Sequence, residues 1–458
     1  MAYPSHKLLT LRLPSMSLRR AGLLIFGLFI SLRLATWALI GNCTALAPDE
    51  QGYVDMFKYV QNPIGPRPAL QWPHTPIFVL KILFLPASIF HSIGFSDLAA
   101  FRAQSVTLSL IIGLLLVRAM RVLGIRDKFE SLSRIGKSKF LMFIVAATCT
   151  PTVIIWSILG LREVFLYLSL ILLFLSIANL YHSEGRNNFL WLIPLIGSLV
   201  VLGNTKFYVY VIVLISVFVL VILEAVNKSN LRRSIYVLLI TFSSMIPFTQ
   251  QISEIKFPQI RFSEVHFSFN FLDSLSTPRL PSTTFTEMRA CETNGTAGPL
   301  VNQALKLSRT FMPKRTAQIE SQVPIDTPAA TALRADDSIR NQLNLFDLPL
   351  GLVYFLFFPF SVISSGIFGV LGIVEVIFWL PLYATVLVQL YRSRSRIRKE
   401  PFAALAVTFM LIFTLFSALA EVNFGTAIRH RSLLLIPMLL LATYLWAEKK
   451  KPSASSEV

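Results

Sequence analysis

The sequence predicts an all-α polytopic membrane protein with about ten transmembrane helices, interfacial helices and a small outer α+β cap. Three observations lead to this prediction: 54% of the 458 residues are hydrophobic, only 14% are charged, and the mean hydropathy is +0.64. A soluble protein of this composition would have too little interior for its apolar side chains. Many apolar runs of about 18 to 22 residues match the thickness of a bilayer, which excludes a disordered chain.

The first transmembrane helix is expected from Ala21 to about Ile40. The segment before it carries four basic residues and no acidic one. Because the apolar run is long and no small-residue cleavage pattern follows it, we interpret it as a retained span rather than a signal peptide. The other expected spans are residues 98–122, 140–160, 164–182, 189–205, 207–226, 234–250, 370–391, 401–420 and 432–447.

Two further apolar segments, Pro76–Phe95 and Leu348–Ser364, contain internal prolines and are expected to lie in the outer membrane interface as amphipathic helices. If Pro76–Phe95 crossed the membrane, the loop 118–139 with its seven basic residues would fall outside, against the positive-inside rule. With both segments in the interface, the cytoplasmic side holds 23 basic and 7 acidic residues, which is +16 of the total +18. Both chain termini are then cytoplasmic.

The basic charge is dispersed over short loops between the spans rather than concentrated in one groove or arm. A nucleic-acid-binding protein gathers its cations beside aromatic side chains, so we expect no nucleic-acid partner. The three cysteines, Cys43, Cys149 and Cys291, are too few for a disulfide framework or a Cys-rich zinc site. Cys43 and Cys291 are both expected outside, where their pairing stays open.

These spans divide the chain into three parts. Residues 1–250 form an N-terminal membrane region that includes a first outer catalytic loop at 43–97. Residues 251–345 form a second outer loop, and residues 346–458 hold an interfacial helix and the C-terminal transmembrane helices. The second outer loop is long enough for a small extramembrane cap.

The expected cap contains one strand and two helices. Val265–Phe271 alternates apolar and polar residues, which is typical of a half-buried strand. Leu300–Met312 and Ala329–Leu343 have a helix-like composition. Together these segments predict a cap of mixed α and β structure.

Asp49 and Glu50 begin the first outer loop, directly after Pro48 and before the helix-compatible run Val54–Gln61. Pro48 is expected to end the preceding span and to place both carboxylates at a helix N-terminus, where the dipole keeps them ionised. Either carboxylate could take a proton from an acceptor hydroxyl as a general base, or bind a divalent cation such as Mg²⁺ or Mn²⁺. The alternative is that the two carboxylates only cap the N-terminus of the helix and face solvent.

Short turns on the same outer side carry further charges. Arg162 and Glu163 stand between two apolar runs, where they can join the first loop's acids around a charged substrate or extend to the interface as helix-end side chains. Lys206 also lies between two spans, a position that commonly anchors a helix end. These residues are candidates for binding an anionic substrate.

The last outer turn, before the final span, contains Arg429, His430 and Arg431. Two arginines offer bidentate donors that match phosphate oxygens, and His430 is expected to be a hydrogen-bonded neighbour. Two more charges interrupt spans: Arg33 in the first and Glu375 in the eighth. Because charges inside a membrane are unfavourable, these two are expected either to pair or to line a functional cavity.

This combination resembles the GT-C superfamily of integral-membrane glycosyltransferases, which use polyprenyl-phosphate sugars. The similar features, in chain order, are the acidic pair with Tyr53, the proline-bearing segment Trp72–Pro86, the passage from Pro151 to Leu161-Arg162-Glu163, and the Arg-rich turn before the last helix. Leu348–Phe360 is similar to a segment of bacterial members of the mannosyl- or galacturonosyl-transferase type. Relatives often carry an aspartate in the second outer turn, where this chain has Glu163.

The resemblance implies a transferase that moves a sugar from a polyprenyl-phosphate carrier, by inversion, to a lipid-linked or envelope-glycan acceptor at the outer face of a bacterial plasma membrane. Asp49 is then the base, with Glu50 as alternate or metal ligand, and Tyr53 contacts the substrate. Cations at Arg162, Lys206, Arg429 and Arg431 hold the leaving phosphate. Two alternatives stay open: a polymerase of lipid-linked polysaccharide repeat units, and a lipid or solute transporter with Arg33 and Glu375 along its pathway.

Overall fold

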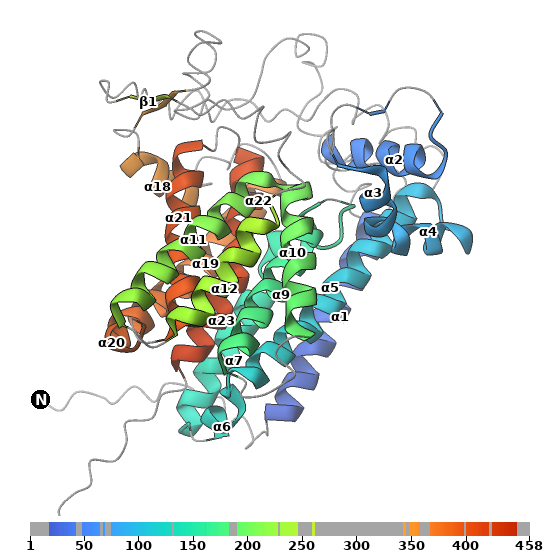
Figure 1. Ribbon diagram of the computed structural model, residues 1–458. Coiled ribbons are helices and arrows are strands. Elements are labelled where there is room, and N and C mark those ends of the chain that lie inside the picture. Colours follow the sequence, from blue (N-terminus) through green and yellow to red (C-terminus); the bar gives the residue numbers. More distant parts are fainter. Residues whose placement is uncertain are drawn as a thin grey trace, which may run out of the picture.

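The computed structural model describes residues 18–42, 48–64, 67–68, 75–130, 132–160, 162–182, 190–227, 230–245, 259–261, 342–344, 348–357, 367–397, 400–420 and 424–446 (Figure 1). Its first twelve helices are α1 (Leu18–Ile40), α2 (Pro48–Gln61), α3 (Ile77–Leu83), α4 (Leu85–Ser92), α5 (Asp97–Val122), α6 (Ile125–Glu130), α7 (Arg134–Thr148), α8 (Pro151–Trp156), α9 (Glu163–His182), α10 (Leu192–Thr205), α11 (Phe207–Asn227) and α12 (Leu231–Ser243). The remaining elements are β1 (Gln259–Arg261), β2 (Gln342–Asn344), α18 (Leu348–Phe357), α19 (Ile367–Arg392), α20 (Arg394–Ile397), α21 (Pro401–Ala420), α22 (Phe424–Leu433) and α23 (Leu435–Trp446).

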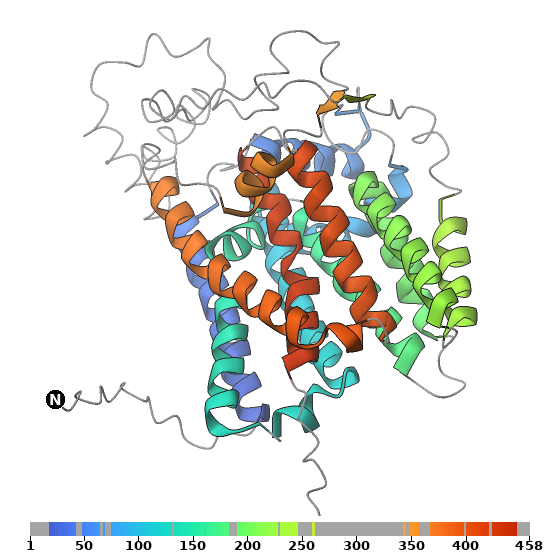
Figure 2. The same cartoon turned by 90° about the vertical axis from the view of Figure 1, so that its left-hand side faces the viewer.

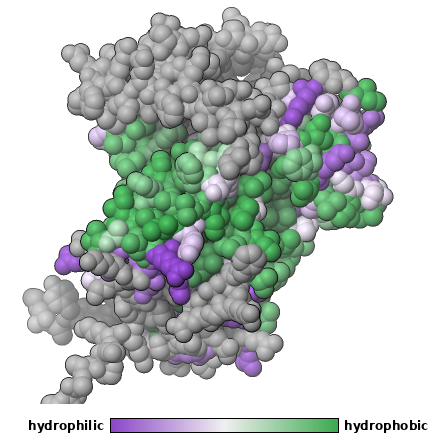
Figure 3. Space-filling model, in the orientation of Figure 1, coloured by the Kyte–Doolittle hydropathy of each residue, from purple (hydrophilic) through white to green (hydrophobic). Residues whose placement is uncertain are grey.

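Five helices in the described ranges are long and apolar enough to cross a membrane. These segments are Gly22–Ile40, Asp97–Val122, Glu163–Tyr181, Phe207–Asn227 and Pro401–Leu419. On the face shown in Figure 3, a broad apolar band covers the middle of the bundle, and hydrophilic residues lie toward its two ends. The prediction of a polytopic helical membrane protein is confirmed, whereas the total of ten spans stays a prediction.

The core of the bundle lies around α9. In an apolar stretch of 18 residues of α9, 78% of the residues are buried, whereas in the corresponding stretch of α1 only 17% are. Helix α1 therefore runs along the periphery. Helices α5 and α10 pack on α9, and α11 packs on α12 and α21. Helix α19 packs against α7 and α23 and crosses this side of the bundle at a slant (Figure 2).

The two ends of the bundle carry different short elements. We call the end with α2, α3, α4 and α22 the α2 end, and the opposite end with α6 and α20 the α6 end (Figure 1). Arg118 and Arg121 close α5 at the α6 end, and Arg392 and Arg394 lie at the junction of α19 with α20 there. Two of the basic segments expected on one side are thus found at one end, while the orientation in a membrane stays a prediction.

The first span ends earlier than Pro48, the residue expected to end it. Gly41 follows α1 with a φ of 73°, the left-handed conformation that commonly terminates a helix, and its N–H donates to Trp37 O at 2.9 Å. The expectation that Asp49 and Glu50 lie at a helix N-terminus is met, because α2 begins at Pro48. A proline is well suited to the first position of a helix, where its missing N–H would have no partner within the helix. Asp49 and Glu50 therefore lie in the first turn of a helix.

The expected span 140–160 is divided between α7 and α8. Pro151 is the cause, because a proline has no N–H to donate to the preceding turn and its ring crowds that turn. The freed backbone is partly satisfied by Thr150, whose hydroxyl donates to Ala146 O at 3.0 Å. A similar break at Leu434 divides the expected span 432–447 between α22 and α23, three residues before Pro437.

The proline-bearing segment 76–95 forms α3 and α4, of seven and eight residues. A span needs about 20 residues, so neither helix crosses the membrane. Phe78 and Ile82 are 66% and 67% exposed, whereas Leu80 is fully buried against the core. The segment thus presents apolar side chains both to the protein core and to the outside. This arrangement suits helices that lie at the membrane interface, as the sequence predicts. Leu348–Ser364 contains the ten-residue helix α18.

The two strands pair in parallel, with Gln259 opposite Gln342 and Arg261 opposite Asn344. The segment expected to be helical up to Leu343 therefore ends in a strand, because Gln342 and Leu343 pair with β1. The strand expected at Val265–Phe271 and the helix expected at Leu300–Met312 lie outside the described residues, as do Cys43 and Cys291. Cys149 is a free thiol.

Candidate functional site

The first turn of α2 is tied to the rest of the bundle through Glu50, which is fully buried. Arg102 Nε donates to Glu50 Oε1 at 2.8 Å, and Arg102 Nη2 donates to Oε2 at 2.8 Å. The backbone N–H of Gly160 also donates to Oε1, at 3.0 Å. Arg102 donates in addition to the carbonyl oxygen of Gly41, directly after α1. Glu50 therefore joins α2 to α5, to the end of α1 and to the turn before α9.

This anchoring brings the start of α2 beside the turn that leads to Arg162. The turn packs closely on α5, because a Cβ on Gly160 would lie 2.7 Å from Phe101 Cδ1. Tyr53, expected to contact substrate, is fully buried within the apolar core beneath α2. The first and second loops thus meet at the α2 end, with Tyr53 inside the packing that supports them.

Asp49 shares the first turn of α2, and its side chain lies outside the described residues. The possibility of a metal at Asp49 and Glu50 meets an obstacle in the donor set, because both oxygens of Glu50 already accept hydrogen bonds from Arg102. The described part of the chain also contains no group of three His, Cys, Asp or Glu side chains suited to a metal ion. Glu50, held in this way by Arg102, does not fit the role of a Mg²⁺ or Mn²⁺ ligand.

A second group of charged side chains surrounds Glu163, the first residue of α9. We call Arg162, Glu163, Lys206, Arg429 and His430 the Glu163 cluster. Lys206 Nζ lies 3.8 Å from Glu163 Oε1, and Arg429 Nη1 lies 3.9 Å from the same oxygen. Glu163 is fully buried, and Lys206 and His430 are 5% and 4% exposed. Three turns that are distant in the sequence therefore meet at the α2 end.

His430 and Lys206 are held in direct contact. Lys206 Nζ donates to His430 Nε2. Tyr208, in the first turn of α11, places its hydroxyl oxygen 2.9 Å from His430 Nε2 and 3.1 Å from Nδ1, and the centres of the two rings lie 5.5 Å apart. Burial lowers the pKa of His430 well below its ordinary value, and the nearby cations of Lys206, Arg429 and Arg162 lower it further. His430 is therefore neutral at pH 7.

Two arginines complete the cluster. The guanidinium of Arg429 lies 5.8 Å from the centre of the Trp156 ring, and its side chain is 14% exposed. Arg162 Nη1 reaches Thr205 O at 3.5 Å, the limit of a hydrogen bond. Arg162 Nε makes no hydrogen bond to the described residues, so this donor can serve a bound group.

The Glu163 cluster brings several cations to one buried carboxylate. Lys206 and Arg429 both lie within ion-pair distance of Glu163 Oε1, and Arg162 directly precedes Glu163 in the chain. Neither oxygen of Glu163 accepts a hydrogen bond from the described residues. Cations gathered in a largely buried site suit an anionic ligand, because buried charge needs compensation.

Arg431, expected beside Arg429, lies in a different contact. It is fully buried, and its Nη2 donates to Glu375 Oε1 at 2.9 Å. Trp379 Nε1 donates to the same oxygen at 2.7 Å, and Arg431 Nη1 reaches Leu356 O at 3.2 Å. Arg431 therefore links α22 to α18 and α19. Glu375, expected either to pair with Arg33 or to line a cavity, pairs with Arg431.

Sequence reasoning missed two partners of these charges. Arg102 lies near the start of the long apolar run of α5, and its charge inside a predicted span was the available signal that a buried acid faces it. Tyr208 carried no signal, because a tyrosine at the start of an apolar helix is equally typical of a membrane-interface residue. No protein-family model, curated protein or solved structure matches this chain, so the site must be interpreted from its own geometry.

Proposed function

We propose that this protein is a glycosyltransferase that moves a sugar from a polyprenyl-phosphate carrier to an acceptor hydroxyl at the membrane surface. The observation that carries the proposal is the convergence of Arg162, Lys206 and Arg429 around Glu163. Three cations at one end of the bundle suit the phosphate of a carrier lipid, and the apolar exterior of the bundle suits its polyprenyl chain.

The reaction breaks the bond between the sugar C1 and the phosphate oxygen and forms a bond between C1 and the acceptor oxygen. The acceptor proton passes to Asp49, which the start of α2 holds at the same end as the Glu163 cluster. The departing phosphate gains charge as the bond breaks, and Arg162, Lys206 and Arg429 stabilise that charge in a water-poor setting. Inversion at C1 is the outcome that the family resemblance implies.

In this proposal the α2 end faces the outside of a bacterial plasma membrane, and both termini are cytoplasmic. The gathering of basic segments at the α6 end supports this orientation, because cytoplasmic loops hold the Lys and Arg excess. The acceptor is then a lipid-linked or envelope glycan.

A binding experiment tests the phosphate site. Full-length protein in lipid nanodiscs is titrated with a polyprenyl phosphate and, as matched ligand, the polyprenol of the same length. We expect the phosphate to bind more tightly, and Arg162→Gln or Arg429→Gln to weaken its binding about tenfold, the value of one charge-assisted hydrogen bond. Arg118→Gln removes an exposed cation at the α6 end and should leave binding unchanged.

A transfer assay then tests the reaction. Wild-type protein is supplied with radiolabelled polyprenyl-phosphate sugars and acceptor membranes, and a covalent product is sought. Asp49→Asn should bind the carrier normally and form no product. Equal binding of the polyprenyl phosphate and the polyprenol would refute the phosphate site. Transfer by Asp49→Asn at the wild-type rate would refute the role of Asp49 as the base. Passage of a substrate across liposomes without a covalent product would instead identify a transporter.

A further inference from the structure

A second cationic site lies deeper in the bundle, at Arg33 of α1. The side chain is 1% exposed although α1 as a whole is peripheral. Its guanidinium stacks 3.3 Å from the centre of the Phe29 ring, and Nη1 donates to the Phe29 carbonyl at 3.1 Å. Arg33 Nε finds no acceptor among the described residues. The arginine is therefore turned into the protein with part of its hydrogen-bonding capacity unused.

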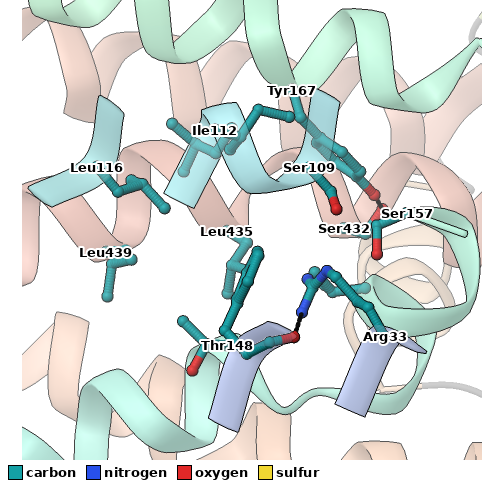
Figure 4. A pocket seen from close by; sticks show the side chains of 13 residues that line it. Arg33, Ser109, Ile112, Leu116, Thr148, Ser157, Tyr167, Ser432, Leu435 and Leu439 are labelled. Carbon is teal, nitrogen blue, oxygen red and sulfur yellow. Dashed lines mark hydrogen bonds between the residues drawn. The ribbon is translucent and has the colours of Figure 1, made fainter. Parts of the chain in front are cut away.

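Arg33 lines a cavity of about 40 Å³ between α1, α5, α9 and α23 (Figure 4). The hydroxyl groups of Ser109, Ser157, Tyr167 and Ser432 gather near the guanidinium, and aliphatic side chains such as Leu439 close the other side. The hydroxyls of Tyr167 and Ser432 are hydrogen-bonded to each other. A single cation therefore faces an apolar pocket with several hydroxyl groups on one wall.

The charge of Arg33 is not balanced by a carboxylate. Among the described residues, no Asp or Glu lies within ion-pair distance of it, and Glu375, the other charge expected inside a span, is taken by Arg431. Glu163 lies one helical turn before Tyr167 and faces Lys206 and Arg429. An uncompensated guanidinium in a low-dielectric interior is strongly unfavourable, so the fold gains from a counter-ion at this place.

We propose that the Arg33 cavity binds one small monovalent anion of the halide class. A cavity of about 40 Å³ accommodates an ion close to a water molecule in size, whereas a phosphate with its lipid would not fit. Arg33 supplies the balancing charge, and its Nε–H is a donor without an acceptor among the described residues. The hydroxyls of Ser109 and Ser157 donate to Val106 O and Ile154 O, each three residues earlier in the chain, and can rotate toward the ion. Apolar walls disfavour a strongly hydrated dianion, which must give up more of its water than a halide does.

The site is separate from the proposed sugar-transfer chemistry. Tyr167 and Ser432 stand between the cavity and the Glu163 cluster, because Tyr167 lies one turn below Glu163 and Ser432 directly follows the cluster's helix segment. The anion would stabilise the junction of α1, α5 and α9 rather than take part in group transfer. The proposal consequently stands or fails independently of the transferase.

Thermal unfolding of the full-length protein in detergent tests the proposal. The midpoint is measured in sodium chloride and sodium bromide, with sodium gluconate replacing the halide at constant ionic strength. We expect a saturable rise of the midpoint with halide concentration in wild type, because a ligand of the native state stabilises it. Arg33→Gln should abolish the rise. Equilibrium dialysis with radioactive chloride should give one bound ion in wild type and none in Arg33→Gln.

Two controls identify the site. Arg429→Gln removes a cation of the Glu163 cluster and should retain the halide-dependent rise. If Arg33→Gln does not fold, Tyr167→Phe keeps the ring and removes one hydroxyl, and it should raise the half-saturating halide concentration about tenfold. A wild-type midpoint that is the same in halide and gluconate would overturn the proposal. A halide effect that persists in Arg33→Gln, or that disappears in Arg429→Gln, would also overturn it, as would an unchanged half-saturating concentration in Tyr167→Phe.

Discussion

Glu50 and Arg102 form a bidentate ion pair, in which each carboxylate oxygen accepts a hydrogen bond from a guanidinium N–H at 2.8 Å. Both side chains are fully buried. Parallel bonds of this kind fix direction as well as distance. The pair therefore sets where α2 begins relative to α5, and with it the position of the neighbouring Asp49.

Removing one partner of this pair should destabilise the protein severely. Glu50→Ala leaves a buried guanidinium without its carboxylate, a change that lowers the free energy of unfolding by about 3–5 kcal/mol. The double variant Glu50→Leu with Arg102→Leu removes both charges and should recover much of that loss. Chemical unfolding in detergent measures both. Equal stability of the single and double variants would show that the two charges do not act as a pair.

Glu163 is expected to compete with phosphate for the same cations. Glu163→Gln keeps the shape of the side chain and removes its charge, so Lys206 and Arg429 lose the carboxylate that they share. We expect this variant to bind a polyprenyl phosphate about tenfold more tightly, the factor for 1.4 kcal/mol. Isothermal titration in nanodiscs gives the affinity. Weaker binding by Glu163→Gln would mean that the carboxylate positions the cations instead of competing for them.

His430 should make the protein less stable in acid. Burial and neighbouring cations lower its pKa in the folded state, whereas the unfolded chain keeps a value of 6.5. The unfolded state then binds the extra proton, so stability is full above pH 6.5 and falls below it, by at most about 1.4 kcal/mol per pH unit. Unfolding midpoints between pH 7.5 and 5 measure the slope. His430→Gln should flatten it, and an unchanged slope would contradict this assignment.

Helix α18 is predicted to tolerate no side chain at Gly351. A Cβ there would overlap the backbone carbonyl oxygen of Ala418 in α21, which cannot move aside as a side chain can. Gly351→Ala should therefore lower the free energy of unfolding by about 1–3 kcal/mol. Gly197→Ala, in α10 with nothing within 4 Å, is the matched control and should stabilise the helix by up to about 1 kcal/mol. Similar effects at both positions would argue against close packing of α18 on α21.

The proposed orientation can be tested with single cysteines in a background that lacks Cys43, Cys149 and Cys291. Gln51, at the α2 end, and Glu130, at the α6 end, are both exposed in the structure. A membrane-impermeant maleimide added to intact cells should label Gln51→Cys and leave Glu130→Cys unlabelled until the membrane is opened. The reverse pattern would place the Glu163 cluster on the cytoplasmic side.

Much of the bundle follows from hydrophobic length, because bilayer thickness imposes it on the sequence. Helices α5, α9, α11 and α21 differ from their expected bounds by one or two residues at most. The helix breaks were harder to foresee. Pro151 ends one helix and begins another, whereas Pro381 lies within α19 without dividing it. Tertiary packing decides which of these outcomes a proline has.

The candidate site was foreseeable in part. The signal at Arg162, Lys206 and Arg429 was charge on the side where the orientation rule disfavours it, and these residues lie together. Arg431 gave the same signal, yet it pairs with Glu375. This pairing could not be predicted, because sequence spacing does not show toward which neighbour a buried helix directs each side chain. The Glu50 pair with Arg102 spans 52 residues, beyond the reach of any local pattern.

The hydrogen bond from Gly160 to Glu50 has a consequence for engineering the protein. It connects pieces of chain 110 residues apart, and Arg102 adds a third piece and Gly41 a fourth. A chimera that replaces the first loop alone would put a foreign residue opposite Arg102 and leave the Gly160 amide without its acceptor. These four segments therefore have to be exchanged together in any engineered variant.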